Sequence, residues 1–256
     1  RLSFGVQSFD PDLLAKLGRT SPGREHLRQL LNCCVRNGVE NINIDLIYGI
    51  PGQTLGAWRE DLARACDLGI AHLSTYELTV EEGSRLAKNY SAHIADSKLA
   101  VDMWHLAADT TASWGLRRYE VSNLAKPGFE CRHNWDIWHG ARYLGIGPAA
   151  SSFDGAVRWT EVANLGEWLG HAPVEIDELS CCRRLGEVFA FGLRTVAGWA
   201  AGEFNLRTGS GVPDECLRTC LGLAAEGLLL GRGDAWKPTE RGLLFSDTVL
   251  ERLLLF

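Results

Sequence analysis

Short apolar segments alternate with helical patterns along the first 123 residues, and this alternation restricts the fold more than any other feature of the chain. Such alternation is typical of βαβ units, in which each crossover helix returns the chain to a parallel sheet. The expected strands are residues 2–9, 41–48, 72–79 and 118–122. The expected helices are residues 10–17, 24–35, 55–68 and 96–114. The sequence therefore predicts an α/β fold with parallel strands in its first half.

The character of the sequence changes after Asn123. Residues 126–175 are rich in Gly, Trp and Pro without clear periodicity, and we expect an irregular connecting region there. In residues 176–256 we expect helices at 178–193, 214–226 and 239–255, with a β-wing at 227–238. This order of elements resembles a winged-helix unit. We therefore divide the chain into an α/β domain over residues 1–125, the connecting region 126–175 and a small helical domain over residues 176–256.

The charge of the chain argues against a nucleic-acid or membrane-surface protein. The formal net charge is −6, and residues 173–256 carry nine Lys and Arg against twelve Asp and Glu. Winged-helix units often bind DNA, but a protein that grips phosphates needs a basic surface. We therefore expect the last domain to act as a packing or lid module. No apolar run approaches the about 20 residues of a membrane span, and we expect none.

Polar residues intrude on the predicted strands at every second position. In the second strand, Asn41, Asn43 and Asp45 alternate with apolar residues. Polar residues occupy one face of the first and last strands as well, at Ser3, Gln7, Arg118, Glu120 and Ser122. Strands of a fully covered parallel sheet are apolar on both faces, so this pattern favours a sheet with one side lining a polar cavity. An exposed strand face or a structural Asn/Asp ladder is the alternative.

The cysteines indicate reduced thiols. The chain has eight cysteines, including the vicinal pairs Cys33/Cys34 and Cys181/Cys182, and no pattern of a small secreted disulfide scaffold. We therefore expect a cytoplasmic protein. Cys216 and Cys220 have CxxxC spacing without a third cysteine at CxxC distance, so we interpret them as core or surface thiols.

Several segments, in the same order along the chain, resemble one known family. They are residues 2–9 with 17–19, the run NIDLIYGIPGQT at 43–54, and residues 72–79, 119–128, 131–134 and 143–147. Together they resemble radical S-adenosylmethionine (SAM) proteins of the oxygen-independent coproporphyrinogen III oxidase-like family, in its heme-chaperone branch. The resemblance implies the C-terminal half of a partial (β/α)6 barrel: the last three core strands and one following strand. A small winged-helix-like α+β domain then follows.

The resemblance also implies a SAM site and a role in heme or porphyrin metabolism. Gln7, Arg19 and Asp45 fall where the family binds SAM. An amide and a carboxylate suit ribose hydroxyls and the amino acid moiety, and arginine suits a carboxylate. The alternatives are a satisfied buried amide at Gln7, a surface ion pair at Arg19 and a helix cap at Asp45.

The branch further implies that His133 and Asn134 handle heme, in a loop that also holds Trp135 and Trp138. Neutral imidazole is a common iron ligand, and indoles offer apolar stacking surface. A loop histidine without a ligand is the alternative. Cys131 is a weaker candidate because little around it favours a thiolate. The sequence departs from the family at Ser21, Ile137 and Ser151, which weakens the case for heme ligation more than the case for the fold.

The largest departure is an absent motif. Family members carry a CxxxCxxC loop that holds a [4Fe–4S] cluster, and residues 1–256 contain none. Because Arg1 is not an initiating residue and Met103 is the only methionine, we expect the chain to belong to a longer polypeptide that carries the cluster. We assign no catalytic residue and no cluster ligand here, and expect that this chain alone does not cleave SAM.

Three interpretations therefore compete. The first is a radical SAM heme chaperone that serves a heme acceptor protein. The second is a degenerate tetrapyrrole- or partner-binding protein without radical chemistry. The third is a generic α/β domain with a winged-helix tail acting as a regulator, which the acidic charge disfavours.

Overall fold

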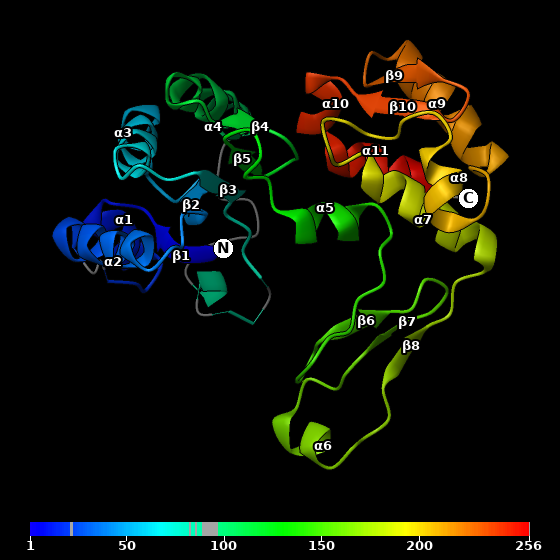
Figure 1. The fold of residues 1–256 in the computed structure, drawn as a ribbon, viewed down its shortest axis with the longest axis horizontal. Helices are drawn as coiled ribbons and strands as arrows, with labels where there is room; N and C mark the ends of the chain where they lie inside the picture. The colour runs from blue at the N-terminus through cyan, green and yellow to red at the C-terminus, as the bar shows by residue number, and fades with distance from the viewer. Residues whose placement is uncertain (21–22, 82, 85, 89–96, 256) are drawn as a thin grey trace. The chain divides into compact units, whose positions relative to one another are not determined.

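The computed structural model describes residues 1–20, 23–81, 83–84, 86–88 and 97–255. The chain forms two compact units, Arg1–Glu130 and Cys131–Phe256, which Figure 1 shows in blue to green and in green to red. Among the described residues, no helix is both long and apolar enough to span a bilayer.

The first unit is built on a five-stranded mixed sheet in the order β1-β2-β3-β5-β4. Its strands are β1 (Leu2–Gln7), β2 (Ile42–Tyr48), β3 (His72–Glu77), β4 (Arg117–Arg118) and β5 (Asn123–Ala125). Its helices are α1 (Pro11–Lys16), α2 (Arg24–Arg36), α3 (Leu55–Cys66) and α4 (Ser97–Thr111), with 3-10 turns η1 (Leu86–Lys88) and η2 (Ala112–Trp114). β1, β2 and β3 are parallel, which confirms the α/β prediction for the first three strands.

The predicted fourth strand at residues 118–122 is wrong. The chain turns there, and β4 and β5 form an antiparallel pair, with β5 running antiparallel to β3. The Arg118 side chain does not line the expected polar face. Its guanidinium lies 3.9 Å from the centre of the Trp104 ring and donates hydrogen bonds to the carbonyls of Trp104 and Val121, at 2.9 Å and 2.8 Å. Stacking on α4 therefore turns this residue away from the predicted cavity.

The apolar face of the sheet forms the core of the first unit. Ile44, Leu46 and Leu73 are fully buried on this face. Trp58 of α3 is also fully buried, and its indole N–H donates to the Met103 carbonyl of α4 at 2.9 Å. Burial of these apolar side chains is the main source of the unit's stability.

The second unit contains more regular structure than the sequence predicts. Its helices are α5 (Arg132–Trp138), α6 (Leu165–Leu169), α7 (Cys181–Gly192), α8 (Glu203–Thr208), α9 (Asp214–Ala225), α10 (Glu240–Leu244) and α11 (Ser246–Leu254). Its strands are β6 (Ser151–Phe153), β7 (Arg158–Thr160), β8 (Glu175–Asp177), β9 (Leu229–Arg232) and β10 (Ala235–Pro238). An antiparallel hairpin, β9–β10, lies within residues 227–238, where the sequence predicts a wing.

Three expectations for this unit need correction. The segment 126–175, expected to be irregular, contains α5, α6 and the antiparallel sheet β6-β7-β8. The single last helix is two helices that divide at Phe245, and α8 was not predicted. These elements are only three to nine residues long, so they carry little periodic signal of their own.

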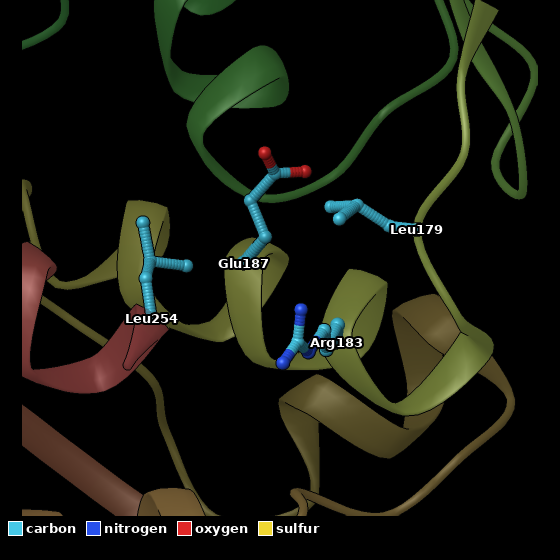
Figure 2. Close-up of a pocket in the computed structure, with 4 residues that line it drawn as sticks. All are labelled: Leu179, Arg183, Glu187 and Leu254. Carbon is cyan, nitrogen blue, oxygen red and sulfur yellow. The ribbon is translucent and has the colours of Figure 1, made fainter. Parts of the chain in front are cut away.

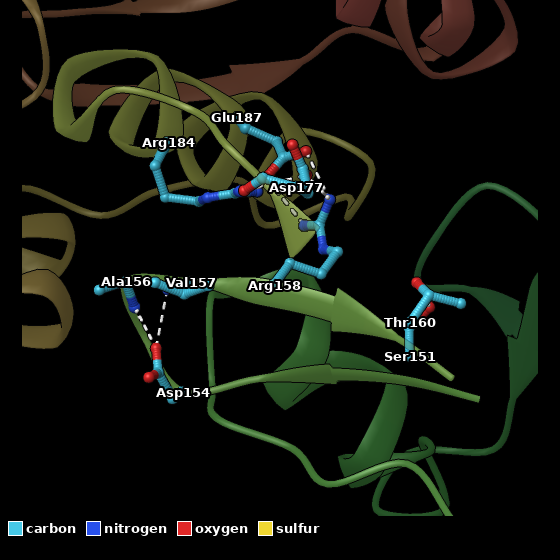
Figure 3. Close-up of polar contacts among 9 residues, drawn as sticks. All are labelled: Ser151, Asp154, Ala156, Val157, Arg158, Thr160, Asp177, Arg184 and Glu187. Carbon is cyan, nitrogen blue, oxygen red and sulfur yellow. Dashed lines mark hydrogen bonds and ion pairs between the residues drawn. The ribbon is translucent and has the colours of Figure 1, made fainter. Parts of the chain in front are cut away.

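A balanced cluster of charged groups fixes the small sheet on α7 (Figure 3). The Arg158 guanidinium donates to both carboxylate oxygens of Glu187 at 2.8 Å, and Arg184 donates to the same carboxylate at 2.5 Å. Asp177 of β8 pairs with both arginines, at 3.4 Å and 3.1 Å. Two positive and two negative groups therefore neutralise one another where Arg184 and Glu187 are largely withdrawn from water.

The core of the second unit is aromatic. Phe189, Trp199 and Phe204 contact one another edge to face or stacked, and all are buried. Cys216 and Cys220 are completely buried in the same core, and burial raises the pKa of each thiol to about 12. These two thiols are therefore core residues, which is one of the two alternatives given in the sequence analysis.

Gly192 is required by this packing. A Cβ at Gly192 would lie 2.3 Å from the Trp199 ring. We expect Gly192→Ala to lower the free energy of unfolding of this unit by about 1–3 kcal/mol through overpacking. Gly211→Ala is the matched control because a Cβ at Gly211 would have no neighbouring atom within 4 Å. Urea unfolding followed by near-ultraviolet circular dichroism measures the difference, and equal stability of the two variants would contradict the packing account.

Candidate functional site

The strand register brings polar side chains of the first unit onto one face of the sheet. Ser3 is paired with Asn43, and Gly5 with Asp45. On the other side of β2, Asn43 is paired with His72 and Asp45 with Ser74. Paired residues of neighbouring strands share a face. The polar face predicted for β1 and β2 is therefore present, and it extends onto β3.

The Asn43 amide joins the three strands across this polar face. Its Nδ2 donates to Asp45 Oδ1 at 2.7 Å and to the Ser3 hydroxyl at 3.2 Å. Its Oδ1 accepts from the Ser74 hydroxyl at 3.2 Å and lies 2.8 Å from His72 Nδ1. Asn43 is only 1% exposed, so every one of these hydrogen bonds replaces lost hydration. The amide thereby holds the Asp45 carboxylate in one orientation.

The buried His72 ring joins Asn43 to Tyr119. Its Nδ1 lies 2.8 Å from Asn43 Oδ1 and 3.2 Å from the Arg1 guanidinium, and its Nε2 lies 2.8 Å from the Tyr119 hydroxyl. Burial, with a smaller contribution from the Arg1 charge, lowers the pKa of His72 to about 3. The neutral ring therefore supports Asn43 over the whole physiological pH range.

Gln7 lies at the end of β1 in a strained conformation. Its φ is 64°, and the amide of Ser8 donates to the Val6 carbonyl at 2.8 Å, which closes a γ-turn around Gln7. A non-glycine residue with this φ costs about 1–3 kcal/mol, and such strain clusters at functional sites. The Gln7 side chain folds back over Gly5: a Cβ at Gly5 would meet Gln7 Nε2 at 2.6 Å. Glycine at position 5 therefore leaves room for the amide.

The three predicted SAM contacts are not all brought together. Gln7 and Asp45 are half-buried on adjacent strands. The register shifts between Gly5 and Gln7, and the Gln7 amide lies over Gly5, the residue paired with Asp45. Arg19 is exposed after α1, where its backbone N–H donates to the Leu14 carbonyl at 2.9 Å. Among the described residues, no polar contact joins Arg19 to the other two. Gln7 and Asp45 therefore lie together in the candidate site, and Arg19 does not join them.

The polar face fits a ligand of the SAM type. Asn123 of β5 is paired with Ser74 and is only 3% exposed, yet its Oδ1 has no hydrogen-bond partner in the described part of the chain. A buried acceptor without a partner is costly unless a ligand or water fills the position. The Gln7 amide and the Asp45 carboxylate complete a set of donors and acceptors that suits ribose and amino acid groups.

An iron–sulfur cluster does not fit these residues. Across the described ranges, no group of three or more His, Cys, Asp or Glu side chains converges on one point. Cys66 of this unit is buried, which raises the pKa of its thiol above the usual range. The polar face of the first unit offers no thiolate to a cluster.

The candidate heme residues lie on a helix, and the prediction of a loop at this position is wrong. His133 is exposed on α5, and Asn134 Oδ1 accepts from the Cys131 thiol at 3.4 Å. The neighbouring indoles are engaged in packing. Trp135 stacks on the buried His139 ring at 4.4 Å, and Trp138 contacts Phe191 with centroids 5.8 Å apart. Both indoles are half-buried.

Two cavities of the second unit have linings that do not include His133. One, of about 150 Å³, is lined by residues that include Ile137, Trp138 and Phe191. The other, of about 170 Å³, is lined by Leu179, Arg183, Glu187 and Leu254 (Figure 2). Neither has His133 or Asn134 in its lining. Ser151, where the family pattern has histidine, bonds the Thr160 hydroxyl at 2.9 Å, and Ser21 lies outside the described residues.

Sequence reasoning did not identify His72, Tyr119 or Asp61 as parts of the polar framework. His72 and Ser74 alternate with apolar residues in β3, which is the same signal that revealed the polar face of β2. Asp61 lies at a core-facing position of α3 between Trp58 and Leu62, where a helical pattern calls for an apolar residue.

The low pKa of His72 makes the stability of the first unit depend on pH. The unfolded chain takes up a proton at His72 near pH 6.5, whereas the folded chain does so near pH 3. The unfolded state binds more protons between these values, so stability falls as pH falls, by at most about 1.4 kcal/mol per pH unit from this group. Hydrogen exchange of β2 amides from pH 7.5 to 5 measures the effect.

We expect His72→Gln to flatten this slope, while His133→Gln, which removes an exposed imidazole, leaves it unchanged. An equal slope in the wild-type and His72→Gln chains would contradict the burial of a neutral His72 ring.

Comparison with known proteins agrees with this architecture. Over 100% of the chain, the structure matches the radical SAM enzyme coproporphyrinogen III oxidase (HemN) from Escherichia coli, with a TM-score of 0.80, 20% identity and 64% of that chain covered. The protein is therefore an α/β protein with the HemN fold. No family model matches the chain.

Curated relatives define the family. The chain is 31% identical over its whole length to the heme chaperone HemW of Lactococcus lactis, and 29% identical over 99% of its length to that of Bacillus subtilis. It spans 69% of each relative, about two thirds of their length. The chain belongs to the HemW heme chaperone family.

Proposed function

We propose that the polar face of the first unit binds S-adenosylmethionine in a radical SAM protein of heme metabolism. The observation that carries the proposal is the placement of Gln7 at the carboxyl end of β1, the end where β/α proteins gather their chemistry, with Asp45 midway along the adjacent parallel strand β2, opposite Gly5. Gln7 would supply an amide and Asp45 a carboxylate held by Asn43. Arg19 is the third proposed contact, and its guanidinium would pair with the carboxylate of SAM. SAM supplies radical chemistry when a reduced cluster lies beside it.

The finer architecture belongs to the same proposal. In it, β1, β2 and β3 are the last three core strands of a partial (β/α)6 barrel over residues 1–125, and the hairpin β4–β5 follows them. Helices α7 and α9, the wing β9–β10 and helices α10 and α11 form a winged-helix-like domain within residues 176–256. The nine basic and twelve acidic residues of 173–256 support a packing or lid role over DNA binding.

We further propose that the chain handles heme or porphyrin and passes it to an acceptor protein in the cytoplasm. The relatives are heme chaperones by name, and the exposed His133 imidazole on α5 is open to an incoming iron. Asn134, one residue on, is the second proposed contact. The engaged Trp135 and Trp138 rings would contribute their edges to the macrocycle.

A ligand titration tests the SAM site. S-adenosylhomocysteine lacks the reactive sulfonium, so it reports binding without chemistry. We expect Asp45→Ala to weaken its binding to the 256-residue chain at least tenfold, because the carboxylate is a direct contact. Asp109→Ala, at an exposed position of α4, is the matched control. Isothermal titration calorimetry gives both dissociation constants, and equal values for the two variants would rule out Asp45 as a contact.

A hemin titration followed at the Soret band tests the heme proposal. We expect a saturable band shift in the wild-type chain that His133→Ala abolishes, because the imidazole is the proposed iron ligand. His26→Ala removes another exposed histidine, from the first unit, and should leave the shift unchanged. A shift that persists in His133→Ala would remove His133 from the heme site.

A further inference from the structure

The turn after Gln7 is fastened to α3 by one buried carboxylate. Asp61 Oδ2 accepts from the Ser8 hydroxyl at 2.7 Å, and Asp61 Oδ1 accepts from the Phe9 backbone N–H at 2.8 Å. Ser8 Oγ in turn accepts from the Asp10 backbone N–H at 3.1 Å. These contacts connect α3 to the two residues that directly follow Gln7.

This carboxylate is unusual for its position. Asp61 is 2% exposed on the face of α3 that also buries Trp58, Leu62 and Ala65. Burying a carboxylate is costly unless hydrogen bonds compensate, and here both oxygens are used by the turn. Burial raises the pKa of Asp61, and the hydrogen bonds from Ser8 and Phe9 oppose that rise. A purely structural position would be filled more simply by an apolar side chain.

The Asp61 carboxylate holds the strained turn around Gln7. Gln7 has a φ of 64°, and Ser8 closes the γ-turn around it through its own backbone N–H. The Ser8 side chain faces Asp61 while its backbone faces Val6, so the two contacts clamp the same residue from two sides. The turn places the Gln7 amide over Gly5, where no Cβ obstructs it.

We propose that Asp61 is a positioning residue for ligand binding, acting through Ser8 and Phe9 to hold Gln7 in its strained turn. The inference rests on the proposed SAM site, since Gln7 is the residue expected to contact the ligand. The cavity of about 160 Å³ that Asp61 also lines, together with Asp10 and Arg64, does not account for the carboxylate, because each of its oxygens already accepts a hydrogen bond from the turn.

Two readouts on the 256-residue chain test this role. The first is the nuclear Overhauser effect between the Gln7 side-chain amide protons and the Gly5 Hα protons, which reports the turn itself. The second is the dissociation constant for S-adenosylhomocysteine by calorimetry. Ser8→Ala removes the hydrogen bond to Asp61 and the one that the hydroxyl accepts from the Asp10 N–H, and Asp61→Ala removes both hydrogen bonds of the carboxylate. Ser8→Thr keeps the hydroxyl, and Glu60→Ala changes an exposed neighbour on α3.

We expect Ser8→Ala and Asp61→Ala to lose the Gln7–Gly5 effect and to weaken ligand binding about tenfold or more, whereas Ser8→Thr and Glu60→Ala keep both. Retention of the Overhauser effect in Ser8→Ala and in a folded Asp61→Ala chain would overturn the proposal, as would unchanged affinity. If the wild-type chain itself does not bind S-adenosylhomocysteine, the SAM proposal fails, and the Overhauser measurement alone decides whether Asp61 positions Gln7.

Discussion

The Asn43 amide is the interaction on which the first unit depends. A parallel sheet normally buries apolar side chains on both faces, and a polar face survives there only when its donors and acceptors are paired. Asn43 meets that requirement by bonding residues of all three parallel strands, so β1, β2 and β3 keep one register. The neutral His72 ring and the Tyr119 hydroxyl extend the pairing to the edge of the sheet. The Asp45 carboxylate is consequently presented in a fixed orientation.

The two ends of the candidate site are supported in different ways. Asp45 is held from within its own sheet by Asn43, whereas the turn of Gln7 is held from α3 by Asp61 through Ser8. The first support uses hydrogen bonds on the polar face, and the second crosses to the helix layer. On this proposal, a disturbance of either layer should reach the site, and the buried carboxylate at a core position of α3 has a role in holding it.

In the second unit, charged side chains connect the small sheet to a helix. Its small antiparallel sheet contributes Phe153 to the core shared with α7, and the ion pairs of Arg158, Glu187 and Arg184 attach it to that helix. Because the positive and negative groups balance, the cluster tolerates withdrawal from water, while removal of one member would leave an unpaired charge. The aromatic core around Trp199 supplies the remaining cohesion, with Gly192 leaving space for the indole.

Periodicity by itself determined much of this protein: the helices α2, α3 and α4, the three parallel strands, and the polar faces of β1 and β2. These features follow from local repeats of 2 and 3.6 residues, which a sequence displays directly. The family resemblance indicated Gln7 and Asp45, which now lie on adjacent strands.

Tertiary structure alone decided that Arg118 stacks on Trp104 instead of lining the polar face, that residues 118–122 turn, and that His133 lies on a helix. It also decided which side chains support the candidate site. His72 contacts Asn43, 29 positions away in the chain, and Asp61 contacts Ser8, 53 positions away. Hydrogen bonds between distant segments form only once the apolar face has packed, so no local pattern records them.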